Sequence, residues 1–289
     1  MDRLEIFNEH RRLLFSLAYR MLGSVADAED MVQETFLRWQ QSGAEEIKAP
    51  KAYLSTIITN LCINHLQSAR TTREEYIGPW LPEPLITDEN QDPMRNVNLA
   101  DSLSMAFMVL LESLTPIERA VFLLREVFDY EYEEIARMVG KTEANCRQMC
   151  SRARLHIRER RPRFDVSKQT QDRLTVEFMQ TCASGDLPGL ISLLSEDVTV
   201  FSDGGGVVTA ARKPIQGADH VARFLTGLVK KAGAAHLTVR PTRVNGQPGF
   251  ITYLNGRLQN VLALDISDNR ICAIYIVVNP NKLRRISDN

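Results

Sequence analysis

Positively charged side chains gather in one short stretch of the 289-residue chain, from Lys141 to Arg163. This stretch has eight Lys or Arg against two acids, Glu143 and Glu159, although the net charge of the whole chain is −1. Guanidinium groups bind phosphates and guanine, while Asn and Gln side chains suit adenine. A basic block inside a nearly neutral chain is typical of a nucleic-acid contact surface.

A helix–turn–helix is predicted to carry this basic block. A short amphipathic helix from about Glu131 ends at Gly140, where glycine permits a left-handed turn, and a second helix begins after Thr142. Cys146, Cys150 and Ala153, with Met149 in part, would face the core. We expect the exposed face of the second helix to enter the major groove of DNA. The alternative is a solvated basic helix. The expected contacts are Asn145, Arg147, Gln148, Ser151 and Arg152.

Three further helices are predicted within residues 4–73. The first ends at Gly23, Ser24 caps the second, and Pro50 opens the third. The second helix carries an acidic, hydrogen-bonding stripe beside its apolar face. Alone, that stripe indicates no more than a solvated helix face. The stripe consists of Asp27, Asp30, Gln33 and Glu34.

Together these motifs resemble the extracytoplasmic-function sigma factors, the smallest type of the sigma-70 class. The phrase SVADAEDMVQETFLRW resembles the region 2 segment that docks on the β′ clamp helices of RNA polymerase. The following YLSTIITNLCINHLQSAR is similar to the helix that meets the melted minus-ten element, although family members often have Asp where this chain has Asn64. The resemblance implies polymerase contacts at Asp27, Asp30, Gln33, Glu34 and Leu37, and minus-ten contacts at Asn60, Asn64, Arg70 and Arg73.

The same resemblance implies the partners. They are core RNA polymerase, through its β′ clamp helices and β flap, and promoter DNA, whose minus-thirty-five element the second helix of the helix–turn–helix would read. The expected division is region 2 at 1–73, a proline-rich linker at 74–97, region 4 at 98–163, and a further domain at 167–289.

The further domain is predicted to be an α+β fold. Helical segments come first, and runs such as HLTVRPTRV, GFITYLN and ICAIYIVVN, separated by Gly, Asn and Asp, then favour one curved antiparallel sheet. A short strand is also expected near Val207–Arg212.

Four phrases resemble the sigma-factor subgroup with a fused, cone-shaped SnoaL-like domain: WLPEPL, GKTEANCRQ, DGGG and NPNKL. In that subgroup the extra domain is thought to regulate the sigma factor in cis. We expect the linker, with Trp80 as an apolar anchor, to dock near DGGG; a semi-rigid spacer with Trp80 packed on region 2 is the alternative. Asn281 stands where the terminal motif usually has Asp. The expected regulatory residues are Trp80, Leu81, Pro82, Asp203, Gly204, Gly205, Gly206, Asn279, Pro280, Lys282 and Leu283.

An enzyme fused to a DNA-binding regulator is the rival interpretation, because polyketide cyclases and ketosteroid isomerases share the cone fold. Catalysis in a cone needs a carboxylate or His–Asp pair in an apolar pocket. The candidates do not group in the sequence, so we expect no enzyme, no catalytic residue, no metal and no cofactor, and leave open an unidentified small ligand in the domain. These candidates are Asp203, Asp219, His220, His236, Tyr253, Asp265 and Tyr275.

Composition sets the remaining expectations. The five cysteines are scattered and odd in number, which favours buried thiols over a disulfide framework. No apolar run reaches the ~18–20 residues that cross a bilayer, and the N-terminus lacks the apolar stretch of a signal peptide. We therefore expect a cytoplasmic protein without membrane contact, monomeric when free.

Overall fold

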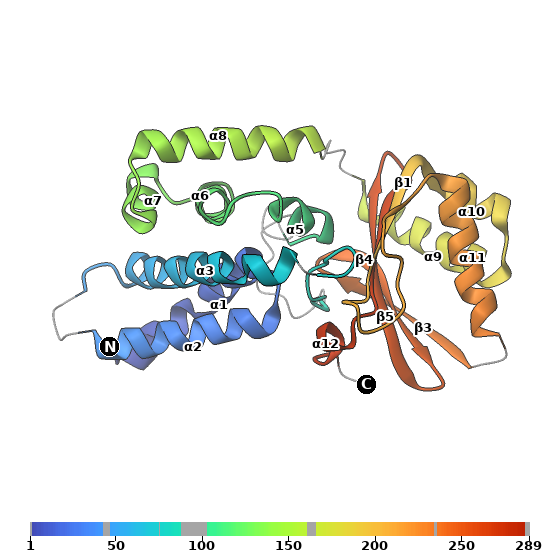
Figure 1. The fold of residues 1–289 in the computed structure, drawn as a ribbon, viewed down its shortest axis with the longest axis horizontal. Coiled ribbons are helices and arrows are strands. Elements are labelled where there is room, and N and C mark those ends of the chain that lie inside the picture. Colours follow the sequence, from blue (N-terminus) through green and yellow to red (C-terminus); the bar gives the residue numbers. More distant parts are fainter. Residues whose placement is uncertain are drawn as a thin grey trace. The chain divides into compact units, whose positions relative to one another are not determined.

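The computed structural model describes residues 2–42, 47–74, 76–87, 103–160, 166–233 and 236–286 (Figure 1). The chain divides into two compact units. The first comprises Met1–Glu75 and Met108–Pro162, and the second comprises Tyr76–Phe107 and Arg163–Asn289. None of the described helices is long and apolar enough to span a membrane.

Three helices begin the first unit: α1 (Arg3–Leu22), α2 (Val25–Gln41) and α3 (Pro50–Glu74). Gly23 ends α1 in the left-handed conformation at φ 68°, which glycine adopts without steric cost. The Ser24 side chain then accepts a hydrogen bond from the Asp27 amide and caps α2. The helix boundaries predicted at Gly23, Ser24 and Pro50 are therefore confirmed.

The helix–turn–helix of the first unit consists of α7 (Tyr132–Val139) and α8 (Glu143–Arg160), preceded by α6 (Pro116–Glu126). Thr115 and Glu118 form a capping box at the start of α6, and Gly140 ends α7 at φ 64°. The predicted helix–turn–helix is confirmed. A further helix, α5 (Met105–Leu111), begins in the second unit and ends in the first.

The α1–α3 bundle and the α6–α8 segment pack against each other within the first unit. The Arg119 side chain is buried; its Nη1 donates to the Met21 carbonyl at 2.6 Å and forms an ion pair with Glu112 at 2.6 Å. The buried hydroxyls of Ser55 and Tyr130 are hydrogen-bonded at 2.7 Å. Because a buried charge is costly unless it is paired, the Arg119 contacts favour this one arrangement of the two parts.

The second unit is built on a six-stranded sheet with the order β2-β1-β6-β5-β4-β3. Its helices α9, α10 and α11 share one apolar core with the sheet; Phe178, Leu190 and Val221 come from the helices, and Phe250 and Ile274 come from the strands. The bounds are α9 (Lys168–Ser184), α10 (Leu187–Leu193), β1 (Leu194–Asp203), β2 (Ile215–Gln216), α11 (Ala218–Ala232), β3 (Leu237–Val244), β4 (Gln247–Leu254), β5 (Arg257–Ser267), β6 (Arg270–Val277) and α12 (Pro280–Leu283).

The sheet is mixed, whereas the sequence predicted a purely antiparallel one. Strands β3 to β6 form an antiparallel meander, but β6 pairs in parallel with β1, because the meander fixes the direction of its last strand. The segment 207–212 was also expected to be a strand. It forms turns and bends instead, and Ile215–Gln216 pairs with β1 in its place.

The parallel pairing has a local result that matters for the site. Asp203, the last residue of β1, lies opposite Val277, the last residue of β6. The chain segments that follow the two strands therefore leave the sheet at the same edge. These segments are the DGGG motif and the NPNKL motif.

All five cysteines are free. Cys62, Cys146 and Cys150 are buried, and Cys182 and Cys272 are half-buried. The expectation of buried thiols thus holds for three of the five residues.

Candidate functional site

The outward face of α8 carries the side chains expected to contact DNA. Its five predicted positions, Asn145, Arg147, Gln148, Ser151 and Arg152, are all exposed. On the opposite face Cys146, Cys150 and Ala153 are buried, as the sequence predicted. The side-chain orientation on this helix is therefore that of a recognition helix packed on its own domain.

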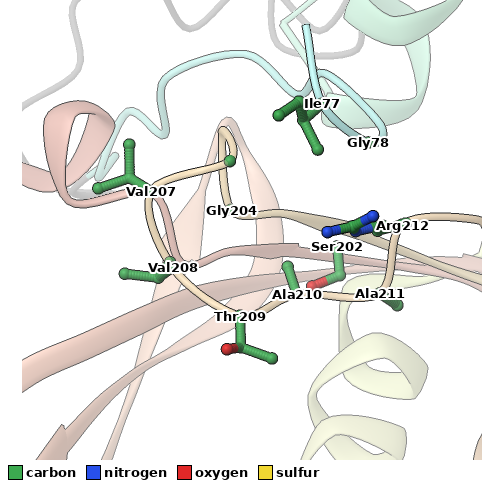
Figure 2. Close-up of a pocket in the computed structure, with 11 residues that line it drawn as sticks. Ile77, Gly78, Ser202, Gly204, Val207, Val208, Thr209, Ala210, Ala211 and Arg212 are labelled. Carbon is green, nitrogen blue, oxygen red and sulfur yellow. The ribbon is translucent and has the colours of Figure 1, made fainter.

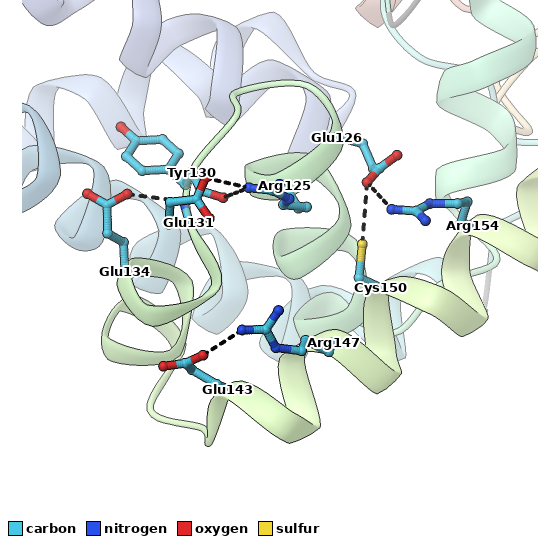
Figure 3. A network of polar contacts seen from close by, with 9 residues as sticks. All are labelled: Arg125, Glu126, Tyr130, Glu131, Glu134, Glu143, Arg147, Cys150 and Arg154. Carbon is cyan, nitrogen blue, oxygen red and sulfur yellow. Dashed lines mark hydrogen bonds and ion pairs between the residues drawn. The ribbon is translucent and has the colours of Figure 1, made fainter.

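Arg147 already has partners on its own domain (Figure 3). Its Nη2 lies 2.8 Å from a carboxylate oxygen of Glu143, as Figure 3 shows. Its guanidinium also lies 4.7 Å from the ring centroid of Tyr132. Both contacts lie at the surface, where ion pairs contribute little stability. A phosphate or a guanine could replace Glu143 at low cost.

A second network fixes the other side of α8 to α6. One carboxylate oxygen of Glu126 accepts hydrogen bonds from Arg154 at 2.7 Å and from the Cys150 thiol at 3.7 Å (Figure 3). Burial raises the pKa of Cys150, so the thiol stays protonated and donates. Arg152 also pairs with Glu118 of α6, at 3.6 Å. The exposed face is thus held at a fixed angle to the domain.

The stripe on α2 is partly exposed. Asp30, Gln33 and Leu37 are exposed, and Leu37 is a large apolar side chain with 49% exposure. Asp27 lies 3.7 Å from the His65 ring, and Glu34 forms an ion pair with Arg38 at 2.9 Å. An apolar side chain surrounded by hydrogen-bonding groups is typical of a protein contact surface.

The residues expected to contact the minus-ten element lie on α3 in different surroundings. Asn64 is exposed. Asn60 is half-buried, and its Nδ2 donates to the Thr56 carbonyl and, at 3.0 Å, to the Met138 carbonyl of α7. In this arrangement the Asn60 side-chain amide is therefore already hydrogen-bonded to the helix–turn–helix. Arg70 and Arg73 fall in the last turns of α3, where the side chains lie outside the described residues.

The linker docks on the second unit around Asp203, which is 0% exposed. One carboxylate oxygen accepts from the Tyr76 hydroxyl at 2.5 Å, and the other from the Leu81 amide at 2.8 Å. The Gly205 amide and the Lys282 ammonium donate to the same carboxylate at 3.0 and 2.7 Å. One buried carboxylate thus joins the linker, the DGGG motif and the NPNKL motif.

Lys282 links the tail to the linker in a second way. Its ammonium donates to the Leu81 carbonyl and lies 4.3 Å from the centroid of Trp80 and 5.1 Å from that of Tyr76. A cation between two aromatic faces gains electrostatic stabilisation from both rings. Burial, followed by the hydrogen bond to Asp203, raises the pKa of Tyr76 above its usual range, so the phenol remains a donor.

The glycines of DGGG allow the linker and the tail to approach the backbone. A Cβ atom at Gly205 would lie 2.2 Å from Asn279 Nδ2, and one at Gly206 would lie 3.0 Å from the Ile77 side chain. Both glycines have positive φ, of 59° and 73°. At Gly204 a Cβ would meet the Val208 carbonyl oxygen at 2.5 Å. A side chain at these positions would therefore force the contacts apart.

The NPNKL motif closes the same cluster. Asn279 caps α12 and donates from Nδ2 to the Tyr76 hydroxyl at 3.0 Å, while Leu283 is buried. Pro280 is exposed at the start of α12, and Pro82 of the linker is buried. Asn281 is exposed and accepts from Arg284 at 2.6 Å; Asp at that position would make an ion pair there.

A second attachment point of the linker was not found from the sequence. Asn245, at the turn between β3 and β4, is 0% exposed and has φ 52°. Its side chain accepts from the Leu85 amide at 2.9 Å and donates to the Leu103 carbonyl at 3.0 Å. The Asn-Gly pair signals a hairpin turn, but nothing in it signals a contact with residues so distant in sequence.

The residues considered for catalysis are scattered in the described part of the unit. Asp265 accepts from Gln247 Nε2 at 3.0 Å, and Gln247 Oε1 in turn accepts from the Met105 amide. Asp219 is exposed in an ion pair with Arg223, and His220 and His236 are exposed as well. Tyr275 is buried and stacks on Phe201, and the Tyr253 hydroxyl is buried without a hydrogen-bond partner in the described structure. Among the described residues no group of His, Cys, Asp and Glu could hold a metal ion.

Comparison with known proteins agrees with this geometry. Family models for Sigma-70 region 2 and Sigma-70 region 4 match residues 6–72 and 104–157. The chain is 35% identical to the ECF RNA polymerase sigma factor SigJ of Mycobacterium tuberculosis, over 96% of this chain and 91% of that protein. It is also 35% identical to the probable sigma factor SigI of the same organism, over 95% of this chain and 92% of that protein.

The crystal structure of M. tuberculosis SigJ superimposes with a TM-score of 0.78 at 34% identity, covering 97% of this chain and 98% of that one. The match thus includes the two sigma regions and the α+β domain that follows them. The chain belongs to the extracytoplasmic-function sigma factors, and its match to SigJ extends over the α+β domain that follows the two sigma regions.

Proposed function

We propose that this sigma factor directs core RNA polymerase to promoters and that its own C-terminal domain restrains it by holding the linker. The single observation behind the restraint is the buried Asp203 carboxylate, which accepts from linker, loop and tail together. A linker held at both Asp203 and Asn245 limits how far the segments that it connects can separate.

Each sigma region is proposed to contact both the polymerase and the promoter. The exposed residues of α2, including Leu37, would bind the β′ clamp helices, and region 4 would bind the β flap. The exposed face of α8 would read the minus-thirty-five element, and α3 would contact the minus-ten element. The eight basic residues between Lys141 and Arg163 support DNA binding, because phosphate neutralisation supplies much of its affinity.

The packing inside the first unit supports a change of shape on polymerase binding. Asn60 cannot bind a base while its amide donates to Met138. We propose that core polymerase separates α7 from α3 and that the docked linker resists this separation. The free protein then populates its competent form rarely, which weakens its apparent affinity for polymerase by the same fraction.

We propose a regulatory rather than an enzymatic role for the SnoaL-like domain. Two of its buried or half-buried carboxylates, Asp203 and Asp265, have partners that position the linker and the residues after it. Both carboxylate oxygens of Asp203 already accept two hydrogen bonds each, so neither is positioned to take a proton from a substrate. Both acids thus have a structural task.

The test is run-off transcription with core polymerase, comparing the wild-type chain with Asp203→Asn and with Asp268→Asn. Asp268 is exposed in the β5–β6 turn and serves as a matched control. If releasing the linker removes ~1–2 kcal/mol of restraint, half-maximal output should need about 5- to 30-fold less polymerase for Asp203→Asn. The control should behave as the wild type.

Two results would contradict the restraint. Equal activity of Asp203→Asn and the wild type would mean that linker docking has no effect on initiation. Loss of activity by a folded Asp203→Asn variant, checked by its thermal transition, would mean that the docked linker assists initiation instead.

A further inference from the structure

A pocket of about 270 Å³ lies between the docked linker and the loop that follows DGGG. Ile77 and Gly78 form one wall, and Ser202 of β1, Gly204 and residues 206–212 form the rest (Figure 2). All of these residues belong to the second unit. The pocket is separate from the apolar core under the sheet, where catalysis was considered.

The polar groups of the pocket are suited to a negative charge. Figure 2 shows the Arg212 side chain extending over Ser202, below Ile77 and Gly78. Within the described part of the chain, neither the Arg212 guanidinium nor the Ser202 hydroxyl has a hydrogen-bond or ion-pair partner, although Ser202 is only 5% exposed. Among the described residues, no Asp or Glu lines the pocket. A guanidinium beside a hydroxyl, without a competing carboxylate, favours an anion that accepts from both.

The other lining groups are apolar and small. Ile77 is 53% exposed and Val208 41% exposed, and Ala210 and Ala211 complete this part of the lining. Pockets for drug-sized ligands span roughly 300–1,000 Å³, so this pocket fits a smaller molecule. An inorganic ion would leave the apolar lining uncovered.

We propose that this pocket binds a small organic carboxylate with a short apolar or aromatic tail, and that this ligand stabilises the docked linker. Its carboxylate lies at Arg212 and Ser202, and its tail contacts Ile77. The regulatory effect of this ligand rests on the proposed role of linker docking.

Ligand binding and linker docking are coupled because the linker forms one wall of the pocket. A Cβ at Gly78 would lie 3.7 Å from Arg212 Cα, so the linker backbone rests directly on the loop. Ser202 immediately precedes Asp203, which holds Leu81. A ligand between Ile77 and Arg212 makes contacts that exist only while the linker is docked. By linkage, the ligand therefore favours the docked state.

The test uses the full chain and sodium benzoate as the probe, with benzamide and sodium sulfate as comparisons. Benzoate should shift the backbone amide signals of residues 204–212 in heteronuclear NMR spectra, with an affinity in the millimolar range. Arg212→Gln should weaken benzoate binding by at least about ten-fold, because it removes a charge-assisted hydrogen bond. Lys213→Gln, an exposed neighbour outside the lining, should weaken binding less than about two-fold.

Several outcomes would overturn the proposal. They are no shift at residues 204–212, equal binding of benzamide, sulfate binding as tight as benzoate, or full binding by Arg212→Gln. The coupling between ligand binding and linker docking is measured separately. Benzoate should slow the hydrogen exchange of the Leu81 amide, and unchanged exchange would refute the coupling. If Asp203→Asn changes transcription while benzoate does not bind, only the pocket proposal fails. If benzoate binds while Asp203→Asn has no transcriptional effect, the restraint fails instead.

Discussion

The Asn245→Ala substitution tests how firmly the linker is attached. Asn245 is fully buried and bonds the Leu85 amide and the Leu103 carbonyl through its side chain. Asn255→Ala is the matched control, because Asn255 has the same φ of 52° at an exposed turn. The strain of placing Ala in a left-handed conformation is therefore common to both variants.

The difference between the two variants isolates the side-chain hydrogen bonds. Each buried amide or carbonyl that loses its partner costs about 1–3 kcal/mol. Asn245→Ala removes the side-chain partner of one half-buried amide and one half-buried carbonyl, whereas the Asn255 side chain accepts from the His236 amide at an exposed position. We expect Asn245→Ala to weaken linker attachment by about 2–4 kcal/mol more than the control does.

Native-state hydrogen exchange measures this loss directly, since the Leu85 amide is the donor to Asn245. A loss of about 2–4 kcal/mol corresponds to roughly 30- to 1,000-fold faster exchange at Leu85, provided that exchange occurs through local opening. Equal Leu85 exchange in the two variants would refute the assignment of Asn245 as an attachment point. Faster exchange throughout the sheet would show that the residue stabilises the domain rather than the linker.

Two other predictions concern DNA binding and pH. Arg147→Ala should weaken promoter binding by ~1–3 kcal/mol if the side chain contacts a base, as measured by footprinting with core polymerase. Arg137→Ala, which removes a similar surface ion pair on α7, should leave promoter binding unchanged. Equal effects of the two substitutions would show that Arg147 does not contact the promoter. Docking raises the pKa of Tyr76. The hydrogen bond from the Tyr76 hydroxyl should therefore contribute fully to linker attachment below pH ~10, and its contribution should decline as the pH rises above ~10. Leu81 exchange, compared with other amides at each pH, should show this decline in the wild type and not in Tyr76→Phe; a decline in both would assign it to another group.

Local chemistry made much of the fold predictable. Gly23, Ser24, Pro50 and Gly140 act on their own helix ends through backbone conformation and capping, so their effects need no distant partner. The inward position of Cys146 and its neighbours on α8 likewise follows from helical periodicity alone. The DNA and polymerase contacts assigned to α8, α3 and α2 stay predictions.

The contacts that depend on distant residues were not predictable in the same way. Asn60 meets a backbone carbonyl 78 residues away, and carbonyl groups carry no sequence signal. Asn245 was visible only as a turn former. The strand expected at 207–212 is absent: the segment follows three glycines and forms turns and bends, and Ile215–Gln216 makes the pairing with β1 at Thr199 and Val200 instead. Family resemblance, not periodicity, pointed to the docking of the linker near DGGG.

The contact between Lys282 and Leu81 can form only late in the synthesis of the chain. The two residues are 201 positions apart, so Leu81 leaves the ribosome well before its partner exists. At ~5–20 residues per second, the delay is roughly 10 to 40 seconds. In the later part of this interval, after region 4 is complete at residue 163, both sigma regions exist while the tail that secures the linker is still being translated. The proposed restraint therefore cannot act on the nascent chain, and each new molecule would pass through one unrestrained period before Lys282 is made.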